Sequence, residues 1–407
     1  MFASIRNIYC FCLLSLLAHA VHENHWVKNA RKIGNFPEEV HLPFSILLPS
    51  PNQQELDQFL KDLYNPKHER YQKYLQPHEF AERFGPKKEH HQPVLDFLES
   101  HNLTVISISE NQFFIFASGS TANINRAFNC KMEQYLDENG RSFHSPHVPP
   151  QIPPGSKAVV GLHNATWFQH STKSSKSLRT DLIKRRKLKS FSVPEVMQAY
   201  NYPTQYQGSN QVIALVEFDN YFDSDIAQYV QENNLPTPSI MRIFLQPTCV
   251  ACCTSAGCSL CQCTHIPNIN PGPDYIEVTL DIELVISVIP KAQVLVYIAA
   301  NVGSYHILLQ IAADNKARVV STSWSAPESD PNLLLAENTI FQQMASQGQT
   351  IVASSGDTGG SSQIVNDPSS QPYVTGVGKF FIALSLAPLK FKLILSFPRW
   401  NFPFCSQ

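Results

Sequence analysis

Two carboxylates stand four residues apart in the run Ile276-Glu-Val-Thr-Leu-Asp-Ile-Glu283, at Glu277 and Asp281. On a helix, side chains at this spacing lie on one face about 5–6 Å apart, and like charges there are mildly destabilising. A solvated helix face is one explanation for the pair. Partial burial is the other, because the neighbouring residues are apolar nearly all round the predicted helix.

Partial burial would give Glu277 and Asp281 a specific chemistry. Neighbouring carboxyl groups in an apolar setting have raised pKa values and share a proton, and such a pair can perform general acid/base work below neutral pH. A third acid, Asp357, follows a predicted buried strand in Ser355-Gly-Asp357. There a glycine turn either points a carboxylate into a cleft or is simply structured by the aspartate.

The elements that position these acids alternate between strands and helices in the second half of the chain. Continuous apolar strands of this kind indicate a parallel sheet with helices on both faces. Sites in such sheets form at the carboxyl ends of the strands, where this sequence places Glu217-Phe-Asp219, Ser323-Trp324 and Asp357. We predict strands at 211–218, 293–298, 318–323 and 350–354, and helices at 275–287, 304–314 and 331–346.

The first half of the chain predicts a different, α+β arrangement. Strand, helix, strand, strand, helix, strand is the order of a ferredoxin-like block, with strands at 40–48, 103–108, 112–117 and 132–136. Ser50 is predicted to cap the first helix, with Pro51 at its first position. No reactive constellation occurs in this block, which indicates a chaperone or regulatory module.

Three further segments complete the expected organisation. Residues 1–20 combine Arg6, an apolar stretch and Ala18-His-Ala20, which is typical of a secretory signal peptide; a buried N-terminal helix is the alternative. Residues 168–190 are a basic linker around Lys184-Arg-Arg-Lys187, either solvated or open to proteolytic processing. The six cysteines within 249–263 are spaced too closely for zinc ribbons and predict a disulfide-stapled insertion whose pairing stays open.

Composition excludes several classes of partner. A net charge of −2 and a pI near 6.7 argue against a general nucleic-acid or anionic-membrane binder. No segment has enough consecutive apolar residues to predict a membrane span. We therefore expect a chain that enters the secretory pathway and works outside the cell or in an acidic vesicular or lysosomal lumen.

The order and spacing of four motifs resemble the sedolisin family of serine-carboxyl peptidases. The block before the linker resembles that family's activation prodomain, so the resemblance extends over about residues 38–378. The motifs are Glu277-x-x-x-Asp281, Val320-Ser-Thr-Ser-Trp324, Ala353-Ser-Ser-Gly-Asp357 and Asp367-Pro-Ser-Ser-Gln-Pro-Tyr-Val-Thr-Gly-Val-Gly378.

This resemblance implies a subtilisin-like fold and a role for each site residue. Glu277 would be the general base for a serine, and Asp281 would orient and polarise it. Asp357, protonated at acid pH, would donate a hydrogen bond to the oxyanion. Ser323 and Trp324 would bind substrate. The implied partners are a peptide or protein substrate and the chain's own prodomain, as an intramolecular inhibitor or chaperone.

The pattern departs from the family after Gly378. The family's Gly-Thr-Ser nucleophile motif and its C-terminal calcium site are not found in residues 379–407, an aromatic and aliphatic tail. No nucleophile, metal ligand or cofactor is therefore identified in this chain, and the parallel sheet is expected to be incomplete at its C-terminal side.

The expected organisation is thus a signal peptide at 1–20, a prodomain at 21–167, the linker at 168–190, a partial peptidase domain at 191–378 and the tail at 379–407. The predicted function is a precursor of an acid-acting endopeptidase or tripeptidyl peptidase, inactive as the 407-residue chain. The alternative is a non-catalytic, secreted relative that binds peptides or regulates an active enzyme. Asp357-Thr-Gly359 also imitates an aspartic protease motif, but those enzymes need two such loops.

Overall fold

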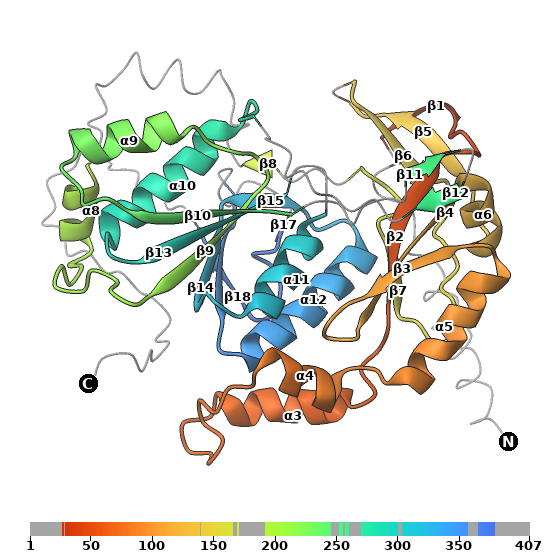
Figure 1. Ribbon diagram of the computed structural model, residues 1–407, viewed down its shortest axis with the longest axis horizontal. Helices are drawn as coiled ribbons and strands as arrows, with labels where there is room; N and C mark the ends of the chain where they lie inside the picture. The colour runs from red at the N-terminus through yellow and green to blue at the C-terminus, as the bar shows by residue number, and fades with distance from the viewer. Residues whose placement is uncertain are drawn as a thin grey trace, which may run out of the picture.

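Two α/β blocks form the part of the chain that the structure, a computed structural model, describes (Figure 1). The described residues are 27, 29–138, 140–165, 169–170, 192–245, 252–254, 257–259, 270–299, 303–356 and 365–378. The predicted signal peptide, most of the linker, the tail at 379–407 and Asp357 lie outside them. Cys252–Thr254 and Gly257–Ser259 pair as a small antiparallel hairpin, β11 and β12, within the cysteine-rich insertion.

A six-stranded parallel sheet is the centre of the second block, in the order β10-β13-β9-β14-β16-β18. The parallel sheet predicted from the apolar runs is confirmed, and two strands that the sequence did not predict, β10 and β18, form its edges. The strands are β9 (Val212–Glu217), β10 (Ser239–Phe244), β13 (Gln293–Ile298), β14 (Val319–Thr322), β16 (Thr350–Ser354) and β18 (Val374–Val377).

Helices cover both faces of this sheet, as expected for a subtilisin-like α/β fold. On one face lie α9 (Asp223–Glu232) and α10 (Tyr275–Val288); on the other lie α11 (Ser304–Asp314) and α12 (Pro331–Ser346), and α8 (Val193–Ala199) flanks α10. The helix α10 is partly buried, one of the two arrangements that its composition left open. It buries one face on the sheet and leaves Ile276, Leu280 and Leu284 exposed on the other.

The first block contains a four-stranded antiparallel sheet in the order β3-β4-β2-β7. This is the predicted ferredoxin-like order, but its fourth strand was assigned wrongly. Residues Ala158–Val160 occupy that place, whereas the predicted strand near 132–136 pairs in a separate three-stranded sheet, β1-β5-β6. The strands are β1 (Arg31–Asn35), β2 (His41–Leu47), β3 (Thr104–Ile108), β4 (Phe114–Ser120), β5 (Met132–Leu136), β6 (Ser142–Pro146) and β7 (Ala158–Val160).

Four helices complete the first block: α3 (Gln53–Leu63), α4 (Pro77–Phe84), α5 (Lys88–Ser100) and α6 (Thr121–Ala127). The predicted cap of the first helix is wrong. Asn52 precedes α3, and the hydroxyl of Ser50 instead donates to the carbonyl of Phe84, 2.8 Å away, which joins the entrance of α3 to the end of α4.

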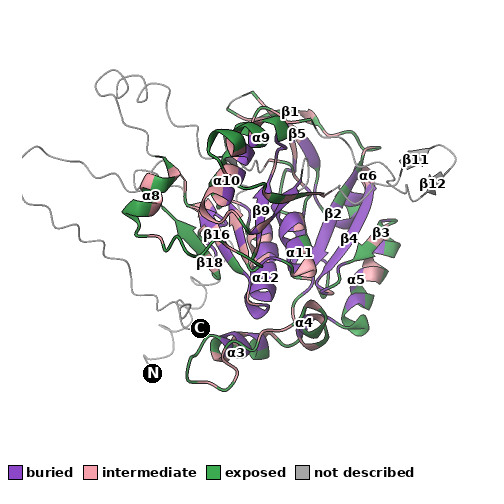
Figure 2. Cartoon of the chain, turned by 60° about the vertical axis from the view of Figure 1, so that its left-hand side comes forward, coloured by how far each residue is buried: buried purple, intermediate pink, exposed green. Residues whose placement is uncertain are grey.

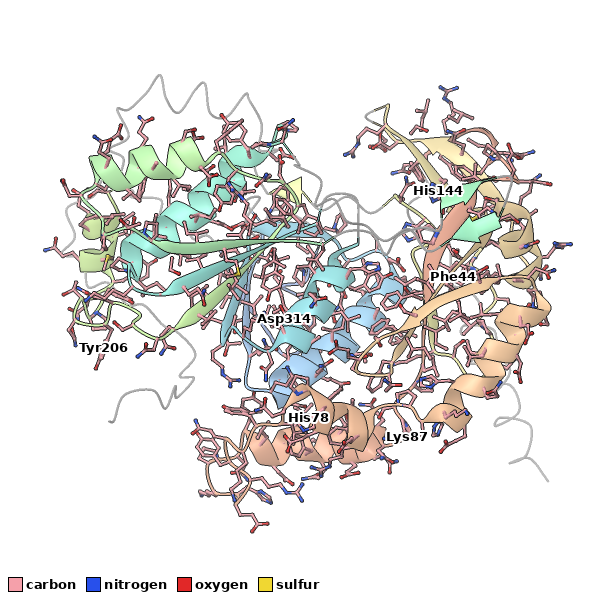
Figure 3. All side chains as sticks on the ribbon, viewed as in Figure 1. Phe44, His78, Lys87, His144, Tyr206 and Asp314 are labelled. Atoms are coloured by element: carbon pink, nitrogen blue, oxygen red, sulfur yellow. The ribbon has the colours of Figure 1, made fainter. Side chains whose placement is uncertain are left out.

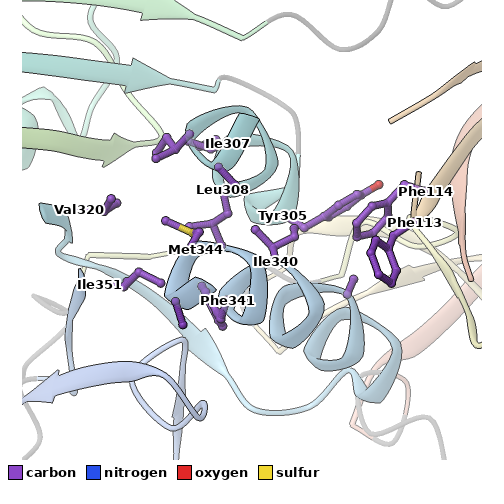
Figure 4. Packing of buried hydrophobic residues seen from close by; sticks show 14 of the residues in the cluster. Phe113, Phe114, Tyr305, Ile307, Leu308, Val320, Ile340, Phe341, Met344 and Ile351 are labelled. Carbon is purple, nitrogen blue, oxygen red and sulfur yellow. The ribbon is translucent and has the colours of Figure 1, made fainter. Parts of the chain in front are cut away.

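The two blocks share one hydrophobic core. Phe113 and Phe114 of the first block pack in the same cluster as Tyr305 of α11 and Ile340 and Phe341 of α12 (Figure 4). The helices α11 and α12 therefore lie between the parallel sheet and the four-stranded sheet, and Figure 2 shows them buried while the outer surfaces of α8 and α9 are exposed.

Strand alternation explains how one sheet can bury both of its faces. Successive side chains of a strand point to opposite faces. On β4, Phe114 and Phe116 join the shared core, whereas Ile115 and Ala117 join a second core under α5 and α6. Phe44 on β2 belongs to this second core (Figure 3).

A seam of polar contacts accompanies the apolar contact between the blocks. The hydroxyls of Ser45 and Tyr305 are 2.9 Å apart, and the amide of Asn111 donates to Gln343 Oε1 over 2.7 Å, both in buried positions. His163 Nε2 lies 2.8 Å from Asp330 Oδ2. A buried polar group that loses its partner destabilises the fold. These pairs therefore favour one relative position of the two blocks.

The turn after α12 offers a test of this packing. Gly348 has φ +75°, and a Cβ on it would lie 2.8 Å from the ring of Tyr74 in the first block. We expect Gly348→Ala to lower the free energy of unfolding by about 1–3 kcal/mol, measured by denaturant titration, through backbone strain and displacement of the ring. Gly140→Ala shares the positive φ but meets no atom within 4 Å, so it should cost less; equal losses would show that the Tyr74 contact is irrelevant.

Candidate active site

Asp281 lies beside the carboxyl end of strand β14. The hydroxyl of Ser323, the residue directly after that strand, donates to Asp281 Oδ1 over 2.8 Å. The carboxyl ends of parallel strands meet at one edge of a sheet, so residues distant in sequence converge there. Asp281 on α10 and Ser323 at the end of β14 are thus brought together, a contact that the sequence did not predict.

Glu217, the last residue of β9, is the buried partner of Asp281. It is 0% exposed, and Trp324 Nε1 donates to its Oε2 over 2.7 Å. The other oxygens, Glu217 Oε1 and Asp281 Oδ2, are buried with no ordinary donor, and the two carboxyl groups are hydrogen-bonded to each other. Two acids can make that contact only by sharing a proton.

Burial is the main cause of the raised pKa values at this pair. Burial and then the charge of Asp281 raise the pKa of Glu217 well above its ordinary value. Burial also raises the pKa of Asp281 to about 6, although the hydrogen bond from Ser323 opposes the shift. Both carboxyl groups therefore hold their protons to a higher pH than exposed carboxyl groups do.

Glu277 is half-buried one helical turn before Asp281. Its charge contributes to the raised pKa of both Asp281 and Glu217. The sequence predicted a proton shared between Glu277 and Asp281, and the structure adds Glu217 as a carboxyl partner of Asp281. Glu217 belongs to the carboxylate cluster, although none of the four sequence motifs contains it.

The turn that should carry Asp357 is described only as far as Gly356. Gly356 has φ +94°, a backbone conformation that favours glycine, and Ser355 Oγ donates to the carbonyl of Val377 over 3.0 Å. Asp357 lies outside the described residues, so its place relative to Asp281 stays a prediction.

A short strand from the linker lies against the residues that follow Ser323. Strand β8 (Gln169–His170) pairs antiparallel with β15 (Trp324–Pro327), and β17 (Asn366–Asp367) pairs with the opposite edge of β15. In this sheet Trp324 is opposite His170 and Ser325 is opposite Gln169. The backbone of β15 therefore holds an extended segment of polypeptide next to the carboxylate cluster.

A second buried acid pair lies at α12. Glu337 is 0% and Asp367 2% exposed; the hydroxyl of Ser304 donates to Glu337, and Gln371 Nε2 donates to Asp367 Oδ1 over 2.9 Å. Burial and then Asp367 raise the pKa of Glu337 well above its ordinary value. The pair shares a proton in the same way as Glu217 and Asp281, and Asp367 belongs to β17, which pairs with β15 at Ala326.

The second pair makes stability depend on pH. A raised pKa means that the folded chain keeps a proton that the unfolded chain loses above about pH 4.5, so stability falls as pH rises from there. We expect Glu337→Gln to reduce this loss, so that its melting temperature exceeds that of the wild type at pH 7 by more than at pH 4.5. Glu328→Gln, on the exposed end of the loop before α12, is the matched control and should leave the pH dependence of melting unchanged.

A metal-binding cluster and a membrane-spanning helix are both absent from the described residues. These residues contain no group of three or more His, Cys, Asp or Glu side chains that could hold a metal ion. None of the helices within them is long and apolar enough to cross a membrane.

Comparison with known proteins identifies the first block. Residues 28–165 match the family model of the pro-kumamolisin activation domain. The first block is thus similar to an activation domain, and the block with the six-stranded parallel sheet follows it in the chain.

Relatives of the whole chain point to the same class. The chain is 27% identical to kumamolisin from Bacillus sp. (strain MN-32) over 325 residues, covering 75% of this chain and 56% of that protein. It is 25% identical to sedolisin from Pseudomonas sp. (strain 101) over 373 residues, covering 84% of this chain and 60% of that protein. The chain is similar to members of the sedolisin family, and it spans between half and two thirds of the length of these relatives.

A solved structure of Pseudomonas sedolisin, a serine-carboxyl proteinase in complex with two molecules of pseudo-iodotyrostatin, is also similar to this chain. The sequence identity is 22% and the TM-score 0.38, over 46% of this chain and 53% of that chain.

Proposed function

We propose that this chain is the precursor form of a serine-carboxyl peptidase that acts at acid pH, as an endopeptidase or a tripeptidyl peptidase. The observation that carries the proposal is the carboxylate cluster at the strand ends, in which Asp281 bonds to Ser323 and shares a proton with the buried Glu217. A cluster of carboxyl groups with raised pKa values suits chemistry in which carboxyl groups replace histidine.

Each residue then has a defined task. Glu277, the more accessible acid on α10, is proposed to accept the proton of an attacking serine hydroxyl. Asp281 orients Glu277, and Glu217 holds Asp281 through the shared proton while Trp324 fixes Glu217 from the other side. Asp357 is proposed to donate its proton to the oxyanion.

The strand β15 supports a peptide as the substrate. An extended peptide can add to the edge of a strand by main-chain hydrogen bonds, and β8 uses this edge of β15. We infer that Ser323 and Trp324 belong to the substrate-binding strand and that the linker occupies it in the precursor. This occupation, together with the shared core, supports the prodomain as an intramolecular inhibitor.

The 407-residue chain is itself proposed to be inactive and to reach an acidic or extracellular compartment by the secretory pathway. Its sequence contains no Gly-Thr-Ser, so no serine is assigned as the nucleophile. Purified 407-residue protein should show no hydrolysis of peptides between pH 3 and pH 7. Substantial acid-pH hydrolysis that pepstatin does not inhibit would contradict this part of the proposal.

Transcript sequencing across codon 378 decides between the two candidate functions. A product that continues into Gly-Thr-Ser should hydrolyse peptides at acid pH, and Glu277→Gln in that product should lower kcat/KM by about 100-fold or more. A transcript that ends after codon 407 instead favours a non-catalytic relative that binds peptides at β15 or regulates an active enzyme; the absence of Gly-Thr-Ser is the observation behind this second candidate.

A further inference from the structure

Asp219 holds the entrance of helix α10 from the end of strand β9. Its side chain is 8% exposed, and its two carboxylate oxygens accept three backbone N–H groups. Oδ1 accepts from Asn220 and from Gly272, each over 2.7 Å, and Oδ2 accepts from Asp274 over 2.9 Å. Asp219 is outside the four sequence motifs, and the roles proposed for the site residues do not involve it.

The contacts fix the segment from which α10 starts. Asp274 immediately precedes the helix, and its own side chain makes no capping hydrogen bond. A Cβ on Gly272 would lie 2.8 Å from Asp219 Oδ2, so the backbone approaches the carboxylate as closely as only glycine allows. Asp219 therefore supplies from another element the acceptors that a helix N-terminus needs.

Glu217 and Asp219 together hold α10 at two points. Residues two apart in an extended segment point to the same side. Glu217 bonds to Asp281, and Asp219 binds the backbone at 272 and 274. Glu277 lies between these two points, one turn from each.

We propose that Asp219 is a positioning residue that fixes the start of α10 and thereby places Glu277 against the Glu217–Asp281 pair. This inference rests on the proposed role of Glu277 in catalysis. It assigns Asp219 no contact with substrate, and its effect reaches the reaction only through the placement of the helix.

Asp219→Asn is the sharpest perturbation of this contact. An amide keeps one acceptor oxygen and replaces the other by a donor. Whichever way the amide turns, at least one of the three backbone N–H groups then faces a donor. The volume of the side chain hardly changes, so the variant tests the hydrogen bonds rather than the packing.

Trp324 provides the readout, because its indole donates to Glu217 and its fluorescence should follow the ionisation of the pair. The signal is isolated by subtracting a Trp324→Phe protein, since the chain has four tryptophans. We expect a midpoint near pH 6 in the full-length wild type, set by Asp281. In Asp219→Asn the midpoint should fall by roughly one pH unit, because a loosened helix start admits water to a pair whose raised pKa values come mainly from burial.

A double-mutant cycle tests the placement of Glu277 itself. Because the charge of Glu277 raises the pKa of Asp281, Glu277→Gln should lower the midpoint in the wild type. In the Asp219→Asn background the same substitution should shift it by less than half as much. Asp223→Asn, the same change four residues away on an exposed carboxylate, should leave both shifts unaltered.

Three results overturn the proposal: no midpoint change in Asp219→Asn, an equal effect of Glu277→Gln in both backgrounds, or an equal shift in Asp223→Asn. A lower melting temperature without a midpoint change means a merely structural role. If Asp219→Asn does not fold, Gly272→Ala, whose Cβ meets the carboxylate, should reproduce the shift. The titration needs no turnover, so it can succeed even where the peptidase proposal fails.

Discussion

Phe114→Ala is expected to lower the free energy of unfolding by about 3–5 kcal/mol and to loosen both blocks of the chain at once. Phe114 is fully buried on β4, and its ring stacks on Tyr305 of α11 with centroids 6.0 Å apart. Truncation therefore leaves a cavity in a core that the two blocks share. Denaturant unfolding followed by hydrogen exchange in α11, α12 and β4 measures the effect.

The matched control is Val105→Ala on the neighbouring strand β3, where the side chain is 39% exposed. This change should cost well under 1 kcal/mol, because little apolar surface leaves the interior. If Phe114→Ala accelerates exchange in β4 but leaves α11 and α12 unchanged, the two blocks have independent cores and the interpretation of a shared core is wrong.

The second large effect concerns pH. His306 of α11 is mostly enclosed at the contact between the blocks, where its ring stacks on Phe116 of β4 with centroids 5.6 Å apart. Burial lowers the pKa of His306 to about 4. The closed contact therefore keeps the imidazole neutral, whereas an exposed imidazole binds a proton below about pH 6.5.

The sign of the effect follows from proton linkage. A histidine whose pKa is lowered in the closed state weakens that state as pH falls from about 6.5 to 4, with no further change below. We expect the opening equilibrium of α11 against β4 to rise about 20-fold between pH 7 and pH 5. Hydrogen exchange in these two elements, corrected for the intrinsic rate at each pH, measures it.

Two variants separate His306 from its neighbours. His306→Phe keeps an aromatic ring and should remove the rise in opening at low pH. His163→Asn breaks the contact with Asp330 and should lower protection while keeping the pH dependence. His144 also has a pKa lowered to about 4, by burial and then by His163. It is a residue of β6 in the first block (Figure 3), so exchange is read only in α11 and β4. Equal pH slopes in the wild type and His306→Phe would falsify the prediction.

Most of the second block could be predicted because its signals are local. Continuous apolar runs become buried parallel strands, and β13 coincides with the predicted 293–298. By contrast, α9 and β10 were not predicted, since α9 buries only Ile226 and β10 is an edge strand without a fully buried residue. In the first block, β7 has only three residues, too few to show alternation, so the sequence favoured 132–136 as the fourth strand.

The acid cluster was predictable in part for the same reason. Glu277 and Asp281 are neighbours on one helix, so their spacing alone brings them together. Glu217 comes from a strand far earlier in the chain, and only the sheet topology joins it to Asp281. The sequence does show that Glu217 follows a continuous apolar run, which places it at the end of a buried parallel strand. It does not show which other carboxyl group Glu217 contacts.

The topology of the parallel sheet also bears on how fast the chain can fold. Strand β9 lies between β13 and β14, which follow it only after α9, β10 and α10, so its pairing requires the closure of long loops. Pairings of this kind are slow, whereas the hairpin of β3 and β4 in the first block closes locally. The first block can therefore form early and present Phe114 and Phe116 as an apolar surface. The helices α11 and α12 can dock on this surface before the strands of the parallel sheet have paired.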